Sequence, residues 1–283
     1  MKSFIYANRT LLATGLLVAA MLGCKKDDTV TAPGPDLALG TSTLGNVITG
    51  AGGKTLYFFG PDVAGDANCT GGCLDTWPIF YKETPTLGTS LKASDFATIT
   101  RADGAKQTTF KGWPLYYYKN DVNTGDVLGE GIGNGVWQVA KPHYTVMIAS
   151  RQLVGNDGKN YTFDTKEGTG NSIFLTDSLG RTLYAFASDK NNKNNYTKAD
   201  LSNNLTWPIF ETSATIGDIP SVLGKTNFAT ITAVGKTQLT FKGWPLYYFG
   251  ADGGQRGATK GVSVPRPGVW PVVNLTSPVA PAN

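Results

Sequence analysis

The chain has 283 residues, and its 25 basic and 21 acidic side chains give a formal net charge of +4. Lys2 and Arg9 are basic residues of the extreme N-terminus, so the rest of the chain is closer to neutral. The chain is near neutral and has no stripe of basic residues between aromatic residues. It therefore lacks the clustered positive charge that attracts nucleic acid or an anionic lipid surface. We therefore expect no nucleic-acid partner.

The N-terminal segment has the layout of a secretion signal. Lys2 and Arg9 supply positive charge, the run 11–22 is apolar, and Met21-Leu22-Gly23 precedes Cys24. The apolar run has 12 residues, whereas a spanning helix needs about 20. The segment resembles the lipobox signal of bacterial lipoproteins, which implies cleavage of residues 1–23 and lipid on Cys24. A plain secretory signal is the alternative.

The residues after Cys24 predict a tether at the outer membrane. Lys25-Lys26-Asp27-Asp28 resembles the short signal with which some Gram-negative bacteria send lipoproteins to the outer face of that membrane, although a solvated charge run is the alternative. Residues 24–39 are expected to form the lipidated N-terminus and a flexible spacer, because Thr, Ala, Pro and Gly dominate without a hydrophobic period. We expect an outer-membrane, surface-exposed protein whose membrane contact is the lipid anchor.

The composition of the remaining chain predicts an all-β body with antiparallel sheets. The 35 Gly, 13 Phe, 12 Tyr and 6 Trp residues, with hardly a run of helix formers, are typical of many short strands joined by tight turns.

Four segments share one pattern, in which Leu-Tyr begins an aromatic strand and an aspartate ends it. They mark the first to fourth units and lie at 56–62, 115–121, 183–189 and 246–252. A tryptophan follows each of these tyrosines by 20 to 23 residues. Repeated aromatic residues are more often core than an exposed platform. The expected aromatic core is Tyr57, Trp77, Tyr116, Trp137, Tyr184, Trp207, Tyr247 and Trp270.

The four units form two copies of a two-unit block. The stretch Phe-Lys-Gly-Trp-Pro-Leu-Tyr-Tyr occurs at 110–117 and again at 241–248. We expect a first domain at 40–143, a connecting hairpin or linker at 144–164, a second domain at 165–275 and a tail at 276–283. A single ring resembling a four-bladed propeller is the alternative.

Cys69 and Cys73 remain once Cys24 is assigned to lipid. An even pair in an oxidising compartment predicts a disulfide that closes a very small loop. A covalent haem site would need a histidine where Leu74 stands, and a zinc site would need four ligands although His143 is the one histidine of the chain.

The motif Tyr-x-(Phe, Trp or Tyr)-x-x-Asp, the loop around Cys69 and the Trp-Pro after it resemble the secreted repeat of predicted bacterial lipoproteins. The resemblance covers residues 45–275 and implies location and architecture, since the biochemical role of that family is not established. The third unit departs from the pattern, because 196–205 stands in place of the cysteine pair.

The repeated aspartates are expected to accept N–H groups from the loops that follow them and so to fix the turns. The sharper hypothesis is a calcium site built from oxygen ligands in these loops, with no other metal or cofactor expected. The candidate residues are Asp62, Asp66, Asp121, Asn123, Asp126, Asp189 and Asp252.

The chain lacks a Gly-x-Ser-x-Gly elbow, a His-Glu-x-x-His pair and a phosphate loop. We therefore expect no enzyme but a non-catalytic binding or envelope-associated module with an unknown extracellular or periplasmic ligand or protein partner. A glycan-binding or calcium-binding surface module is the alternative. Two further classes are a hydrolase with converging carboxylates and an extracellular redox or haem protein.

Overall fold

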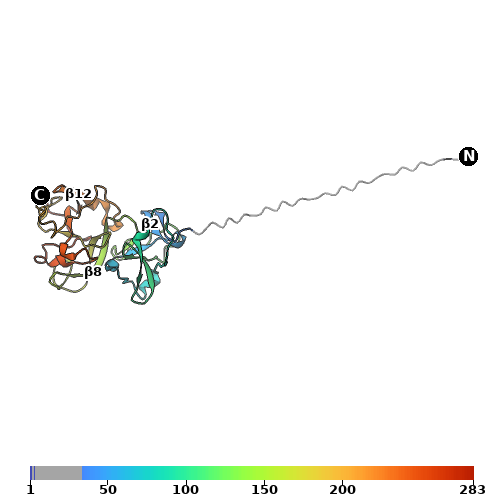
Figure 1. Ribbon diagram of the computed structural model, residues 1–283, viewed down its shortest axis with the longest axis horizontal. Coiled ribbons are helices and arrows are strands. Elements are labelled where there is room, and N and C mark those ends of the chain that lie inside the picture. The colour runs from blue at the N-terminus through green and yellow to red at the C-terminus, as the bar shows by residue number, and fades with distance from the viewer. Residues whose placement is uncertain (2, 4–33) are drawn as a thin grey trace. The chain divides into compact units, whose positions relative to one another are not determined.

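The computed structural model describes residues 34–283 together with Met1 and Ser3. The expected signal, Cys24 and most of the expected tether lie outside these residues. Figure 1 shows the body formed by residues 34–283, which is one compact unit. Within the part of the chain that is described, no helix is long and apolar enough to cross a membrane.

Short antiparallel strands dominate the described residues, so the all-β prediction is confirmed. The strands are β1 (Ala38–Ser42), β2 (Gly45–Thr49), β3 (Tyr57–Phe59), β4 (Phe96–Thr100), β5 (Lys106–Phe110), β6 (Trp113–Pro114), β7 (Trp137–Val139), β8 (Val146–Val154), β9 (Asn160–Tyr161), β10 (Asn171–Asp177), β11 (Tyr184–Ala185), β12 (Phe228–Ala233), β13 (Lys236–Phe241) and β14 (Trp244–Tyr247). The helices are single turns: α1 (Cys73–Thr76) and the 3-10 helices η1 (Ala51–Gly53), η2 (Gly60–Ala64), η3 (Ala93–Asp95), η4 (Ser221–Leu223), η5 (Lys225–Asn227), η6 (Gly250–Asp252) and η7 (Lys260–Ser263).

The two halves of the body, which correspond to the expected domains 40–143 and 165–275, repeat one strand pairing. In the first half β5 lies between β4 and β6, and in the second half β13 lies between β12 and β14. The sharp turn after β5 places Lys111 and Gly112 at φ of 48° and 78°, and the turn after β13 places Lys242 and Gly243 at 49° and 82°. Two successive positive φ values are the signature of the tight hairpin turn that matches strand twist. The repeated Lys-Gly pair therefore reverses the chain in both copies.

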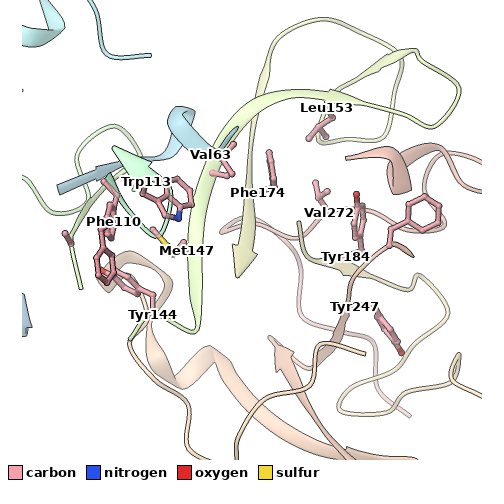
Figure 2. Packing of buried hydrophobic residues seen from close by; sticks show 14 of the residues in the cluster. Val63, Phe110, Trp113, Tyr144, Met147, Leu153, Phe174, Tyr184, Tyr247 and Val272 are labelled. Carbon is pink, nitrogen blue, oxygen red and sulfur yellow. The ribbon is translucent and has the colours of Figure 1, made fainter. Parts of the chain in front are cut away.

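The expected connecting segment 144–164 contains β8 and β9, which pair with each other across the Gly155 turn. β8 also pairs with β10, as β1 pairs with β2 in the first half. Alternate side chains of a strand point to opposite faces, so β8 faces two cores. Met147 and Ala149 pack in a cluster that holds Trp113 of the first half and Tyr184 of the second half (Figure 2), whereas Val146 and Ile148 pack in a separate cluster of second-half residues. β8 thus joins the halves.

Both ends of the body pack against it. β1 begins inside the range expected for the tether, because the Leu37 side chain is fully buried and its N–H donates to the Thr86 carbonyl oxygen at 3.1 Å. In the tail, the Ala280 N–H donates to the Lys242 carbonyl at 2.9 Å. The indole of Trp244 donates to the Pro278 carbonyl at 2.9 Å. Segments that look like spacers in the sequence are therefore held by buried apolar groups and backbone hydrogen bonds.

Arg256, from the second half, forms a further tie to the first half. Its Nε donates to the Val63 carbonyl at 2.9 Å, and its Nη1 donates to the Lys111 carbonyl at 2.9 Å and to the Leu179 carbonyl at 2.7 Å. The guanidinium lies 4.8 Å from the Trp113 ring centroid, a distance at which a cation is attracted to the ring face. Desolvation lowers the pKa of Arg256 to about 10.

We predict that Arg256→Ala lowers the free energy of unfolding by about 2–4 kcal/mol, because three carbonyls of the two halves lose a charged donor at once. Urea unfolding measures the change. Lys225→Ala is the matched control: Lys225 is exposed, so its removal should change stability by about 0.5 kcal/mol or less. A loss of that small size for Arg256→Ala would contradict a role in joining the halves.

Candidate functional site

In each half, the repeated tyrosine of one unit donates its hydroxyl to the repeated aspartate of the other unit. In the first half, Tyr57 Oη lies 2.5 Å from Asp121 Oδ2 and Tyr116 Oη lies 2.6 Å from Asp62 Oδ2. The second half has the same exchange, with Tyr184–Asp252 and Tyr247–Asp189 both at 2.7 Å. All four hydrogen bonds are buried. Each half is therefore closed by two reciprocal Tyr–Asp pairs.

The second carboxylate oxygen of each aspartate holds the loop that follows it. It accepts a backbone N–H six to eight residues further along the chain. The donors are Asn68, Leu128, Asn195 and Lys260, at 2.7, 3.0, 2.7 and 2.9 Å respectively. Each aspartate therefore fixes the loop that follows it, as expected from the sequence. It also binds the tyrosine of the other unit, which was not expected.

The repeated tryptophans stack in pairs at the centre of each half. Trp77 and Trp137 have ring centroids 3.6 Å apart and planes within 4° of parallel. Trp207 and Trp270 repeat this arrangement at 3.7 Å and 8°. Tyr57 meets the edge of Trp77 at 5.3 Å, which is a favourable aromatic geometry. The eight repeated tyrosines and tryptophans are at most 4% exposed, so they form core and not a surface platform.

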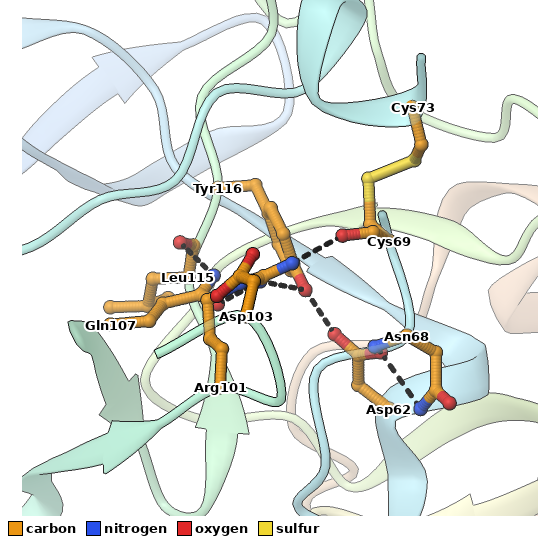
Figure 3. The surroundings of a disulfide bond; sticks show 9 residues. All are labelled: Asp62, Asn68, Cys69, Cys73, Arg101, Asp103, Gln107, Leu115 and Tyr116. Atoms are coloured by element: carbon orange, nitrogen blue, oxygen red, sulfur yellow. Dashed lines mark hydrogen bonds and ion pairs between the residues drawn. A yellow bond between two sulfur atoms is a disulfide. The ribbon is translucent and has the colours of Figure 1, made fainter. Parts of the chain in front are cut away.

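A buried arginine that the sequence analysis missed supports the cysteine loop (Figure 3). Cys69 and Cys73 form the expected disulfide. Arg101, 4% exposed, donates at 2.5 Å both to the Cys69 carbonyl and to the side-chain oxygen of Gln107. Its Nη1 also lies 3.5 Å from the Tyr116 hydroxyl. The signal in the sequence was an arginine at the end of a repeated strand where the second copy has an alanine.

The third unit fills the same space without cysteines. Ala233 takes the position of Arg101, and Gln238 takes that of Gln107. The side-chain amide of Asn194 donates to Gln238 Oε1 at 2.8 Å, so the buried glutamine has a partner again. Tyr196 packs edge-on against Trp270 at 4.7 Å. The Asn-rich loop thus replaces the disulfide and the arginine as the support of the buried polar group.

Burial shifts the protonation of the repeated aspartates. Desolvation raises the pKa of Asp62, Asp189 and Asp252 to about 6, although hydrogen bonds to tyrosine hydroxyls and backbone N–H groups act in the opposite direction. Desolvation also raises the pKa of Asp121. Asp62, Asp189 and Asp252 therefore take up protons just below neutral pH, although their side chains are buried.

The calcium candidates do not gather in one place. The four repeated aspartates are divided between the two halves, and Asp66 is exposed beside a buried Asp62. Asp126 accepts the backbone N–H groups of Val122 and Asn123 at 2.9 and 2.7 Å. Among the residues that the structure describes, no group of three or more His, Cys, Asp or Glu side chains could hold a metal ion. A cation in these loops would have to displace the N–H and O–H donors.

We predict that the coupling between tyrosine and aspartate runs between units and not within them. A double-mutant cycle of Tyr57→Phe with Asp121→Asn should give a coupling energy of about 1–2 kcal/mol, because the hydrogen bond is buried and charge-assisted. The same cycle for Tyr57 and Asp62, which belong to one unit, should give about 0.5 kcal/mol or less. Urea unfolding supplies the free energies, and the opposite ranking would refute the crossed pairing.

We predict that the body is more stable near pH 4.5 than near pH 7. Asp62, Asp189 and Asp252 have folded pKa values of about 6 against an ordinary 3.8, so between these values the folded state holds protons that the unfolded state releases. The free energy of unfolding therefore falls as pH rises from about 4 to about 6, by on the order of 2 kcal/mol per group.

Urea unfolding at several pH values tests this dependence. Asp189→Asn should reduce the slope, whereas Asp75→Asn, at an exposed position, should leave it unchanged. Asp36, whose hydrogen bonds to Thr86 lower its pKa to about 2, keeps its contacts down to pH 4. A steady loss of stability on acidification from pH 7 to pH 4.5 would contradict the prediction.

Comparison with known proteins agrees with this repeated architecture. Residues 38–80, 97–141 and 229–274 each match a family described as a secreted repeat of unknown function. These segments cover the first, second and fourth units, and the third unit, which lacks the cysteines, falls outside them. No curated protein and no solved structure matches the chain significantly. Three segments of the chain therefore carry this secreted repeat, as the tyrosine–aspartate motif predicted.

Proposed function

We propose that the protein is a non-catalytic binding or envelope-associated module, anchored to the outer membrane by lipid on Cys24 and exposed at the cell surface. The proposal that the module is non-catalytic rests on one observation. The repeated tyrosines and aspartates are the groups best suited to proton transfer, and they are bound to each other inside the body. A general acid or base must reach a substrate proton within hydrogen-bond distance. These side chains serve the fold instead.

The hydrolase alternative needs two carboxyl groups that flank a substrate. Asp62 and Asp189 are 0% exposed, and both oxygens of each already accept hydrogen bonds. This argues against their use on a substrate. Turnover of any hydrolase substrate that is abolished by Asp62→Asn, with the fold retained, would overturn the proposal.

A location outside the cytoplasm follows from the family of secreted repeats. The outer-membrane anchor is the finer proposal, and it is supported by the residue order around Cys24 and by the charged run that follows it. Several acyl chains on one residue give stable attachment, because each buried methylene contributes about 0.8 kcal/mol. The near-neutral body offers little electrostatic attraction to a membrane of its own.

We predict that Cys24→Ser abolishes incorporation of an alkyne-labelled fatty acid in a Gram-negative host and shifts the protein from the detergent phase to the aqueous phase. The matched control is the Cys69→Ser/Cys73→Ser variant, which removes the other two cysteines and should retain both the label and the detergent phase. Label retained in Cys24→Ser would refute the anchor. Resistance of the wild-type protein to protease on intact cells, with digestion after lysis, would refute the surface location.

A further inference from the structure

A cavity of about 410 Å³ opens beside the turn between β8 and β9. One wall comes from β8 and this turn, and the other comes from the chain between η6 and η7. The volume falls within the range of sites that take small ligands, about 300–1,000 Å³. Its charged and amide lining residues are Arg151, Gln152, Asn156, Gln255, Arg256 and Lys260. None of these residues belongs to the repeated motif, so the cavity is specific to this region of the fold.

The cavity carries positive charge without acidic side chains in its wall. Arg151, Arg256 and Lys260 line it, and no Asp or Glu does. None of the three takes part in an ion pair of the described body. The acid of the turn, Asp157, is bound to the Tyr161 hydroxyl at 2.7 Å and to the Lys159 N–H. The electrostatics therefore favour an anionic group.

The cationic side chains have uncharged partners or none. Arg256 donates to three carbonyls, and its Nη2 is buried with no hydrogen-bond partner among the described atoms. Lys260 Nζ has one long contact, 3.3 Å from the Ala251 carbonyl. Asp177 acts on Arg256 and Asp252 acts on Lys260 by charge, but neither acid forms an ion pair with these cations, since Asp177 binds Arg181 and Asp252 binds Tyr184. A buried cation that no ion pair compensates is costly. An anion bound in the cavity would compensate this charge.

Arg151 also lines a second cavity of about 340 Å³, so the two cavities share this residue. The second cavity includes Asn171, whose amide can both donate and accept hydrogen bonds, as sugar hydroxyls require. It also includes Asn68, whose amide nitrogen already donates within its own loop and whose Oδ1 can accept. It also includes Phe59, whose half-buried ring is held by stacking on Trp137 at 4.1 Å. A fixed ring beside amide groups suits one face of a sugar.

We propose that the two cavities are neighbouring subsites for an acidic oligosaccharide. The carboxylate of one sugar binds Arg151 and Lys260 in the larger cavity, where a planar guanidinium matches a carboxylate. The adjacent sugar lies against Phe59 and is neutral, because the exposed Asp66 lines that cavity and repels a second acid. The preferred ligand alternates acidic and neutral sugars. This inference rests on the proposed binding function and names its ligand class.

The test uses the full chain in detergent micelles and a tetrasaccharide of unsulfated hyaluronan, which alternates acidic and neutral sugars. Calorimetric titration should show binding that weakens about tenfold or more in Arg151→Gln, since one charged hydrogen bond is lost, and further in Arg151→Gln/Lys260→Gln. Lys225→Gln removes an exposed cation elsewhere and should change the affinity less than about twofold. Neutral chitotetraose and all-acidic tetragalacturonate should bind more weakly than hyaluronan.

Several outcomes would overturn the inference. They are absence of hyaluronan binding at millimolar concentration, binding that the Arg151→Gln and Lys260→Gln variants leave unchanged, and inorganic sulfate that binds as tightly as the tetrasaccharide. Circular dichroism and urea unfolding establish that each variant is folded, and Lys260→Gln alone serves if Arg151→Gln is not. Cleavage of the tetrasaccharide that is lost in Arg151→Gln would support the site while refuting the non-catalytic function.

Discussion

The buried hydrogen bond between a tyrosine of one unit and an aspartate of the other is the interaction on which this fold depends. A carboxylate removed from water is costly unless donors surround it. Here Asp62 obtains its hydroxyl donor from Tyr116, 54 residues away in the neighbouring unit, and Asp121 obtains its donor from Tyr57. A single unit would bury its aspartate without this donor. The reciprocal bond therefore explains why the units occur in pairs.

This dependence separates the residues that define the repeat from those that distinguish this chain. The repeated tyrosines, aspartates and tryptophans are buried and bind or stack on one another inside each half. A ligand therefore has little access to them. The polar groups that line the larger cavity come from residues outside the repeated motif, such as Arg151 on β8 and Lys260 after the fourth aspartate. The backbone N–H of Lys260 holds Asp252 at 2.9 Å while its side chain lines the cavity. The scaffold thus positions the binding group.

Local and periodic features could be predicted from the sequence, and partners distant in the sequence could not. The repeated spacing of Tyr57 and Trp77 in four units indicated an aromatic core, because it recurs along the chain, and glycine-rich turns indicated short strands, because a turn is set by a few consecutive residues. The crossed pairing was missed because Tyr57 and Asp62 lie in one segment and nothing local shows that Tyr57 binds Asp121. Arg256 was missed for the same reason, since its acceptor on Val63 is 193 residues away.

The third unit shows which constraint the fold imposes. In the first half, Gln107 is satisfied by Arg101, which also binds the carbonyl of a disulfide-bonded cysteine. In the second half, Asn194 satisfies Gln238 and no cysteine is present. The same buried amide is thus supported by different side chains, since an unpaired buried polar group costs more than a changed partner. The loop sequences can diverge as long as this requirement is met, so the loops are where a repeat scaffold can acquire a binding site.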